Sequence, residues 1–382
     1  MAGRKVRLRG LEFETGGSVN ATVCLVLVII TFVLAGCGRS GGKDAYPDLL
    51  YLGWDANNEN QIFRLNADDE VVQLTQLANG VYDFAVSPSG TRIGFTTADD
   101  NSSSAIWQLE INDAQPTKIL DCPKQACTQP VWAPDGKRLI YERREIISDG
   151  ISGSPYLWWL NTATGDTYPV LEDSEARGTA VRFSPDGSWL SYVSPEDEGV
   201  YVYHLEDGRS HFFPNEVGMP TVWSPNSDQI IVPNLDLVIV HGDEGDDHLE
   251  HTHDYQTATH LFIADTETGE LKAISGGQNV EDSVAAWSPD GTWIAFGRRP
   301  PRTSAGRQLW LMRPDGSDAR PLTEDPDVNY GPPFWSPDGR YLLFQRIMLA
   351  DPQSGPGIWM LDLQTGEQTE LIDSGMQPQW LD

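Results

Sequence analysis

The tetrapeptide Ser-Pro-Asp-Gly, or a close variant of it, occurs six times in this 382-residue chain. The copies are Ser87–Gly90, Ala133–Gly136, Ser184–Gly187, Ser224–Ser227, Ser288–Gly291 and Ser336–Gly339. Proline presets φ for a turn, aspartate bonds the local backbone and glycine accepts positive φ, so each copy reverses the chain between two strands. Successive prolines lie 40 to 64 residues apart, a spacing that indicates one repeated unit rather than unrelated domains.

Each turn is followed by the same succession of short apolar segments. The first segment after the turn covers Arg92–Thr97, Arg138–Arg143, Trp189–Ser194, Gln229–Asn234, Trp293–Arg298 and Tyr341–Arg346. A second segment with an aromatic residue near its middle comes next, then a tight polar turn such as Asp265–Glu270, and then a third segment. Together with the strand before the tetrapeptide, each unit supplies four antiparallel strands, which is the blade of a β-propeller.

The two ends of the chain supply one more blade between them. Residues 49–75 contain three strand-like segments with no strand before them, and Met376–Trp380 is a strand-like segment with none after it. Pairing these ends closes a ring. The sequence therefore predicts an all-β fold, a seven-bladed β-propeller of four-stranded blades over residues 48–382. Six blades are the alternative if the degenerate copy at Ser224–Ser227 does not belong to a true blade.

The N-terminal region has the features of an export signal. Residues 1–10 carry four basic side chains, residues 15–36 carry no charge, and Val23–Ala35 is almost continuously apolar. A basic segment followed by a short apolar core is typical of a secretory signal, and this core is shorter than the ~20 residues of a spanning helix. The sequence Leu34-Ala35-Gly36-Cys37 is similar to a bacterial lipobox, which implies cleavage after residue 36 and acylation of Cys37.

We therefore expect three regions along the chain. Residues 1–36 form a lipoprotein signal peptide, residues 37–47 form the lipidated cysteine and a flexible tether, and residues 48–382 form the propeller. The expected location is exported and membrane-anchored, facing the periplasm or the extracellular side. An uncleaved N-terminal membrane helix is the alternative, and it also places the rest of the chain outside the cytoplasm.

Cysteine usage agrees with export. Of the four cysteines, Cys24 lies in the signal and Cys37 is the lipid site, which leaves Cys122 and Cys127. In an oxidising compartment, two cysteines five residues apart are expected to form a local disulfide. Two thiolates with no second pair nearby make a poor zinc site.

The repeats resemble those of a known family. The sequence Ala286–Phe296 (AWSPDGTWIAF), followed by Leu309–Met312 and Pro321–Thr323, resembles the Pro-Asp-type, WD-like repeat of TolB-like propeller proteins. Phe334–Phe344 (FWSPDGRYLLF) repeats the match, and the resemblance extends over essentially all of the chain after the signal. It implies the propeller fold and a role in the cell envelope. Similar blades occur in accessory domains of prolyl-oligopeptidase-like proteases and in some polysaccharide lyases.

One interval departs from the repeat. The 64-residue spacing contains an insert, residues 241–260, which holds five of the seven histidines among six acidic residues. Imidazole and carboxylate groups together suit divalent metals. The candidate ligands are Asp247, His248, His251 and His253, and the candidate ions are Zn²⁺, Mn²⁺ and Ca²⁺. The other interpretation is an acidic, solvated loop between two strands of the fifth blade.

Charge limits the class of partner. The chain has 56 acidic against 26 basic side chains, a formal net charge of -30, which argues against nucleic acid and favours a basic partner or cations. No spacing singles out a catalytic residue. We expect a monomeric scaffold that binds an envelope protein or peptide. The alternative is a metal-dependent propeller enzyme, a carbohydrate lyase or hydrolase that uses the histidine-rich insert.

Overall fold

A computed structural model describes residues 46–98, 103–113, 115–147, 150–151, 153–171, 177–240, 254–277, 279–351 and 355–381. All of them belong to one compact unit, Ala45–Asp382. The described residues form strands, turns and loops. Over these residues the structure contains no helix that is long and apolar enough to cross a bilayer.

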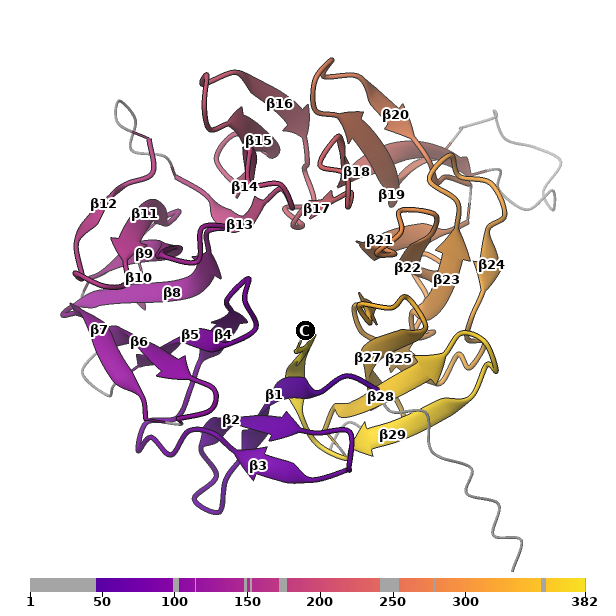
Figure 1. The fold of residues 1–382 in the computed structure, drawn as a ribbon. Helices are drawn as coiled ribbons and strands as arrows, with labels where there is room; N and C mark the ends of the chain where they lie inside the picture. Colours follow the sequence, from indigo (N-terminus) through magenta and orange to yellow (C-terminus); the bar gives the residue numbers. More distant parts are fainter. Residues whose placement is uncertain are drawn as a thin grey trace, which may run out of the picture. The chain divides into compact units, whose positions relative to one another are not determined.

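The strands form seven antiparallel sheets arranged in a ring (Figure 1). From the centre outward, blade 1 contains β30 (Met376–Trp380), β1 (Leu49–Trp54), β2 (Asn60–Leu65) and β3 (Val71–Gln73). Blade 2 contains β4 (Asp83–Val86), β5 (Arg92–Ala98), β6 (Ser104–Glu110) and β7 (Thr117–Cys122). Blade 3 contains β8 (Gln125–Trp132), β9 (Arg138–Ile147), β11 (Tyr156–Asn161) and β12 (Thr167–Pro169), with the short β10 (Gly150–Ile151) on β9.

The remaining four blades follow the same order. Blade 4 contains β13 (Thr179–Phe183), β14 (Trp189–Ser194), β15 (Gly199–His204) and β16 (Ser210–Pro214). Blade 5 contains β17 (Val222–Trp223), β18 (Gln229–Val240), β19 (Asp254–Asp265) and β20 (Leu271–Ala273). Blade 6 contains β21 (Glu281–Trp287), β22 (Ile294–Arg299), β23 (Gln308–Met312) and β24 (Arg320–Pro321). In blade 7, β25 (Val328–Tyr330) and β26 (Phe334–Trp335) both pair with β27 (Tyr341–Met348), which is followed by β28 (Gly357–Asp362) and β29 (Gln368–Ile372).

This arrangement confirms the predicted seven-bladed propeller. The degenerate copy Ser224–Ser227 joins β17 to β18 in a genuine blade, so the six-bladed alternative is wrong. The ring closes as predicted, because β30 pairs antiparallel with β1, with Leu50 opposite Gln379 and Leu52 opposite Met376.

The recurring tetrapeptide forms the turn between the first and second strands of a blade. In blade 4 the backbone N–H of Gly187 donates to the carbonyl of Ser184 at 2.9 Å, and the N–H of Trp189 donates to Ser184 Oγ at 2.9 Å. The same hydroxyl donates to Asp186 Oδ1 at 2.6 Å. Gly187 has φ +75°, and a Cβ there would lie 3.0 Å from Pro134 in the turn of blade 3. Glycine is therefore favoured at position 187 both by the positive φ of the turn and by the close approach of the neighbouring blade.

The hydrophobic core is divided among the junctions between blades. Buried side chains of the described residues form seven clusters, and each cluster joins two adjacent blades. At the junction of blades 7 and 1, for example, Leu49 and Tyr51 pack with Leu343 and Ile358. Second strands of the blades are therefore buried on both faces, which explains why β1 and the first half of β27 are continuously apolar rather than alternating.

Candidate functional site

The histidine-rich insert lies at the end of a long hairpin in blade 5. β18 and β19 are paired from Gln229 opposite Asp265 to Val240 opposite Asp254, a register of twelve residue pairs. The part of the predicted insert from Asp254 to His260 is therefore strand rather than loop. Asp247, His248, His251 and His253 lie outside the described residues, so their role as metal ligands remains a prediction.

His260 is the insert histidine that the structure places. It lies in β19 with 1% of its surface exposed, and its Nδ1 is 3.3 Å from Asp236 Oδ2 on the paired strand. Its Nε2 is buried and has no hydrogen-bond partner among the described residues. Across those residues, no three His, Cys, Asp or Glu side chains converge in a way that could hold a metal ion.

The metal hypothesis has a direct test. If the insert binds metal, the full chain purified without a histidine tag is expected to retain a near-stoichiometric transition metal, measured by elemental analysis. Substituting His248, His251 and His253 together by alanine is expected to remove it, because imidazole nitrogens are the strongest ligands in the segment. Equal metal content in the two proteins would eliminate this site.

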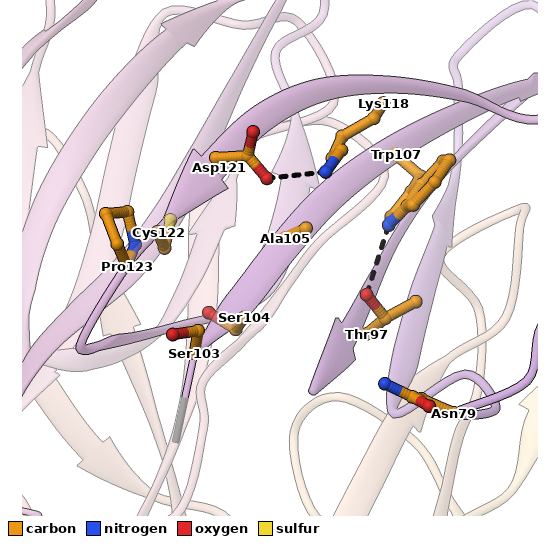
Figure 2. A pocket seen from close by; sticks show the side chains of 10 residues that line it. All are labelled: Asn79, Thr97, Ser103, Ser104, Ala105, Trp107, Lys118, Asp121, Cys122 and Pro123. Atoms are coloured by element: carbon orange, nitrogen blue, oxygen red, sulfur yellow. Dashed lines mark hydrogen bonds and ion pairs between the residues drawn. The ribbon is translucent and has the colours of Figure 1, made fainter. Parts of the chain in front are cut away.

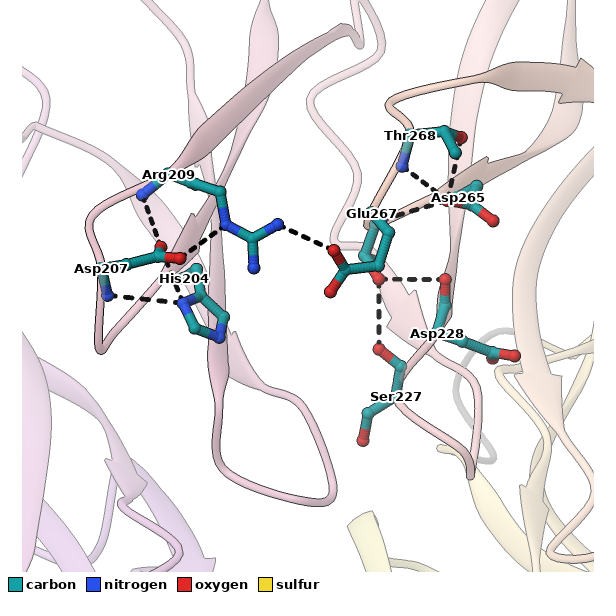
Figure 3. Close-up of polar contacts among 9 residues, drawn as sticks. His204, Asp207, Arg209, Ser227, Asp228, Asp265, Glu267 and Thr268 are labelled. Carbon is teal, nitrogen blue, oxygen red and sulfur yellow. Dashed lines mark hydrogen bonds and ion pairs between the residues drawn. The ribbon is translucent and has the colours of Figure 1, made fainter.

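The two histidines of blade 4 belong to a junction between blades. His204 Nδ1 lies 2.8 Å from Asp207 Oδ1, and Arg209 donates through Nε to Asp207 at 2.7 Å. The other end of the Arg209 guanidinium donates to Glu267 of blade 5 at 2.7 Å (Figure 3). Hydrogen bonds, the largest from the backbone N–H of Arg209, lower the pKa of Asp207. Asp207, Arg209 and Glu267 are exposed, so their ion pairs link blades 4 and 5 but contribute little free energy.

The innermost strands face the centre of the ring (Figure 1), and several carry a β-bulge. At these irregularities Gln129, Ala180 and Val284 have φ between 47° and 55°, a conformation that is strained for a β-branched residue such as Val284. Acidic side chains of the preceding blade hold two of them. Asp83 Oδ2 accepts from the N–H of Gln129 at 2.7 Å, and Glu142 Oε1 accepts from the N–H of Ala180 at 3.1 Å.

Asp83 is unusual among these acids. It is 4% exposed, and desolvation by burial raises its pKa to about 6, a shift opposed by the hydrogen bonds from Thr96 and Gln129 and increased by the charge of Glu142. The carboxyl therefore changes protonation near pH 6, and it holds the first strand of the next blade through Gln129.

Arg182 is the cation of an inner strand. The residue is exposed to water, yet desolvation by the surrounding protein lowers the pKa of its guanidinium, an effect that the charge of Glu142 opposes. Its Nη1 donates to the carbonyl of Val181 at 2.8 Å. Among the described residues, its guanidinium forms no ion pair.

A groove of about 500 Å³ lies on the outer part of blade 2 (Figure 2). Its lining consists of Asn79, Thr97, Ser103, Ser104, Ala105, Trp107, Lys118, Asp121, Cys122 and Pro123. Trp107 donates through Nε1 to Thr97 Oγ1 at 3.1 Å, and its ring stacks on Phe95 with 6.3 Å between centroids. Lys118 Nζ lies 2.7 Å from Asp121 Oδ1 and 5.6 Å from the Trp107 ring centroid.

One cysteine of a disulfide lines this groove. Cys122 is bonded to Cys127, and both residues are buried. Cys122 ends β7 on the outer edge of blade 2, whereas Cys127 lies in β8, the first strand of blade 3. The bond therefore ties the end of one blade to the beginning of the next, beside the groove.

The arrangement in the groove is suited to binding. An aromatic ring offers a flat apolar face, a carboxylate and an ammonium provide charge, and the amide of Asn79 provides a hydrogen-bonding group. A concave surface with an aromatic wall and a few polar groups is the general form of a ligand site. The sequence did not predict this groove, because most of its members come together only through the pairing of β5, β6 and β7.

Comparisons with solved structures identify the fold. TolB from Acinetobacter baumannii matches with a TM-score of 0.51 at 13% sequence identity, over 88% of this chain and 66% of that chain. This chain has the fold of the TolB propeller. The propeller domain of the trilobed protease from Pyrococcus furiosus matches with a TM-score of 0.54 at 14% identity, over 85% of this chain and 91% of that domain.

Peptidases with propeller domains share the same fold. Puromycin hydrolase matches with a TM-score of 0.60 at 14% identity, and 87% of this chain covers 53% of that one. This chain thus spans about half the length of that hydrolase. At this level of identity the likeness concerns the fold alone.

Sequence comparison finds distant relatives. An uncharacterized peptidase of Bacillus subtilis, YuxL, is 27% identical over 195 residues, which cover 44% of this chain and 29% of the relative. The uncharacterized protein Atu1656 of Agrobacterium fabrum is 24% identical over 271 residues, 66% of this chain and 82% of the relative. The match therefore spans less than a third of the peptidase, and no family model matches the chain.

Proposed function

We propose that this protein is an exported, lipid-anchored propeller that binds a protein or peptide partner in the cell envelope, with the groove of blade 2 as the contact site. The observation that carries the proposal is the groove itself, in which Trp107, Lys118 and Asp121 surround an open space beside a disulfide. A disulfide at its wall agrees with function outside the cytoplasm.

The scaffold favours recognition of a large partner. Each blade packs on both neighbours, so the groove lies on a rigid support and a partner meets a preformed surface. The net charge of -30 attracts basic partners and repels acidic ones, which increases the rate of encounter with a basic polypeptide.

The anchoring part of the proposal rests on sequence. Residues 1–36 have the pattern of an export signal, and Cys37 stands at the position that is acylated in bacterial lipoproteins. Two acyl chains on one cysteine supply enough apolar surface for stable attachment to a bilayer. The propeller then lies beside the membrane, where it meets envelope proteins rather than freely diffusing ones.

Site-specific photo-crosslinking in cells of the source bacterium tests this function. With p-benzoylphenylalanine in place of Asn79 in the groove, we expect one defined polypeptide adduct in the membrane fraction. The same photoreactive residue in place of Glu206, on a turn of blade 4, is the matched control and is expected to give no such adduct. The Cys37→Ser chain is expected not to be processed and acylated, so the mature membrane-bound form should be missing.

The outcomes separate the two parts of the proposal. Identical products from positions 79 and 206, or none from position 79, would contradict binding at the groove. A Cys37→Ser chain that is processed and fractionates with the membrane like the wild type would contradict the lipid anchor.

A further inference from the structure

The propeller repeats one aromatic arrangement in four blades. A tryptophan of the third strand stands opposite an aromatic residue of the second strand in the pairs Phe95–Trp107, Tyr141–Trp158, Phe296–Trp310 and Phe344–Trp359. In each pair the second-strand ring is fully or almost fully buried, while the tryptophan is half-buried. The four tryptophans therefore present part of their surface at equivalent places in the ring.

In three of these blades an arginine covers the tryptophan. The residue two positions after the second-strand aromatic is Arg143, Arg298 or Arg346. The guanidinium carbon of each lies 4.5 to 4.7 Å from the centroid of Trp158, Trp310 or Trp359. This distance is that of a cation–π contact, so the fold uses the same interaction three times.

Blade 2 has the tryptophan without the arginine. The equivalent position is Thr97, whose short side chain accepts a hydrogen bond from Trp107 Nε1 at 3.1 Å. Thr97 and Trp107 both line the groove of blade 2, so the open space lies beside the tryptophan surface that an arginine covers elsewhere. Among the described residues, the cation near Trp107 is Lys118, at 5.6 Å from the ring centroid, farther than any of the three arginines.

We propose that the groove of blade 2 receives an arginine side chain of the partner polypeptide, which takes the place that Arg143, Arg298 and Arg346 occupy in their own blades. This inference rests on the proposed binding function and names the group that is recognised. The guanidinium stacks against Trp107 and forms hydrogen bonds with the carboxylate of Asp121.

The charges in the groove permit this exchange. Lys118 and Asp121 form an ion pair with 43% and 70% of their side-chain surface exposed, and such a pair contributes little. Lys118 can therefore turn toward water when a guanidinium approaches Asp121. Arginine fits better than lysine, because its planar group stacks on indole and binds a carboxylate through two parallel hydrogen bonds. An anionic ligand is disfavoured by Asp121 and by the net charge of -30.

Two short peptides and three variants test the proposal on the full-length chain in detergent. The probes are acetyl-Gly-Arg-Gly-amide and acetyl-Gly-Lys-Gly-amide, with binding followed by saturation-transfer NMR. Thr97→Arg supplies the missing arginine from within, as in the other three blades, and is expected to weaken binding of the arginine peptide at least tenfold. Ala98→Arg adds the same charge at the next exposed position of β5 and is the matched control, expected to bind the peptide as the wild type does. Asp121→Asn removes the charge that the guanidinium is proposed to contact and is expected to weaken binding of the arginine peptide. This variant tests the proposal even if Thr97→Arg does not fold.

The proposal requires preference for the arginine peptide and its loss in Thr97→Arg but not in Ala98→Arg. It is overturned if the wild type binds neither peptide, if both peptides bind equally, or if Thr97→Arg and Asp121→Asn bind the arginine peptide like the wild type. If the peptide-binding test fails but position 79 gives a defined adduct, the binding function stands and only the recognition of arginine is refuted. If the peptide-binding test fails and position 79 gives no adduct, the binding function itself is refuted.

Discussion

Arg298→Met is expected to lower the free energy of unfolding by about 3–5 kcal/mol at pH 7. Asp282 is completely buried, and Arg298 donates to its two carboxylate oxygens at 2.6 and 2.9 Å. Removing the guanidinium leaves a buried charge with no counter-ion, and it also removes the cation from the rings of Phe296 and Trp310. Urea denaturation followed by circular dichroism measures the change.

The adjacent residue provides a matched control for this prediction. Arg299 also pairs with an acid, Glu281, at 2.7 Å, but 41% and 26% of the two side-chain surfaces are exposed. We expect Arg299→Met to change stability by less than about 1 kcal/mol. Adding Asp282→Asn to Arg298→Met is expected to restore much of the lost stability, because the uncompensated charge is removed. Equal effects of the two arginine substitutions would show that burial of Asp282 does not determine the result.

The second large effect concerns pH. Burial raises the pKa of Asp83 to about 6, above the value of about 3.9 of an unfolded aspartate. Between these two values the folded state holds the proton more tightly, so stability is lost as pH rises from about 4 to about 6. The difference corresponds to about 3 kcal/mol, since each pKa unit is worth about 1.4 kcal/mol.

Asp83→Asn isolates this group from the other acids of the chain. Asparagine keeps an oxygen for the N–H of Gln129, while its amide can donate to the hydroxyl of Thr96, so the contacts of the carboxyl are largely preserved. We expect the stability of the wild type relative to Asp83→Asn to fall by about 3 kcal/mol between pH 4 and pH 7, measured by urea denaturation at each pH. A constant difference between the two proteins over this range would contradict the raised pKa.

Local sequence signals were sufficient to predict the fold. The tetrapeptide turn depends on contacts within six residues, from Ser184 to Trp189, and such signals are legible in a single chain. Ring closure was also predictable, because the lone strand at Met376–Trp380 needed a partner at the other end of the chain. The extension of the β18–β19 hairpin in blade 5 was harder to predict from the sequence. Length alone indicated an insertion, but the pairing of Asp254–His260 with β18 depends on register, which composition does not reveal.

The groove could not be predicted from any single segment. Its tryptophan follows the same pattern as three others, and what distinguishes it is Thr97 on the paired strand, ten residues earlier. Lys118 and Asp121 come from a third strand, and Asn79 comes from the loop that joins blade 1 to blade 2. Aligning the blades on their buried aromatics would have exposed the missing arginine. The predicted lipid site at Cys37 and the insert histidines at 248, 251 and 253 lie outside the described residues, so for them sequence remains the only basis.

The most direct test of the account combines the groove with its partner in the cell. Photo-crosslinking from position 79 is compared between the otherwise wild-type chain and the same chain carrying Thr97→Arg, with the amount of adduct measured by immunoblotting at equal protein level. The account predicts a defined adduct that is lost, or reduced at least tenfold, when Thr97 is replaced by arginine. An adduct of undiminished intensity in the Thr97→Arg chain would contradict it.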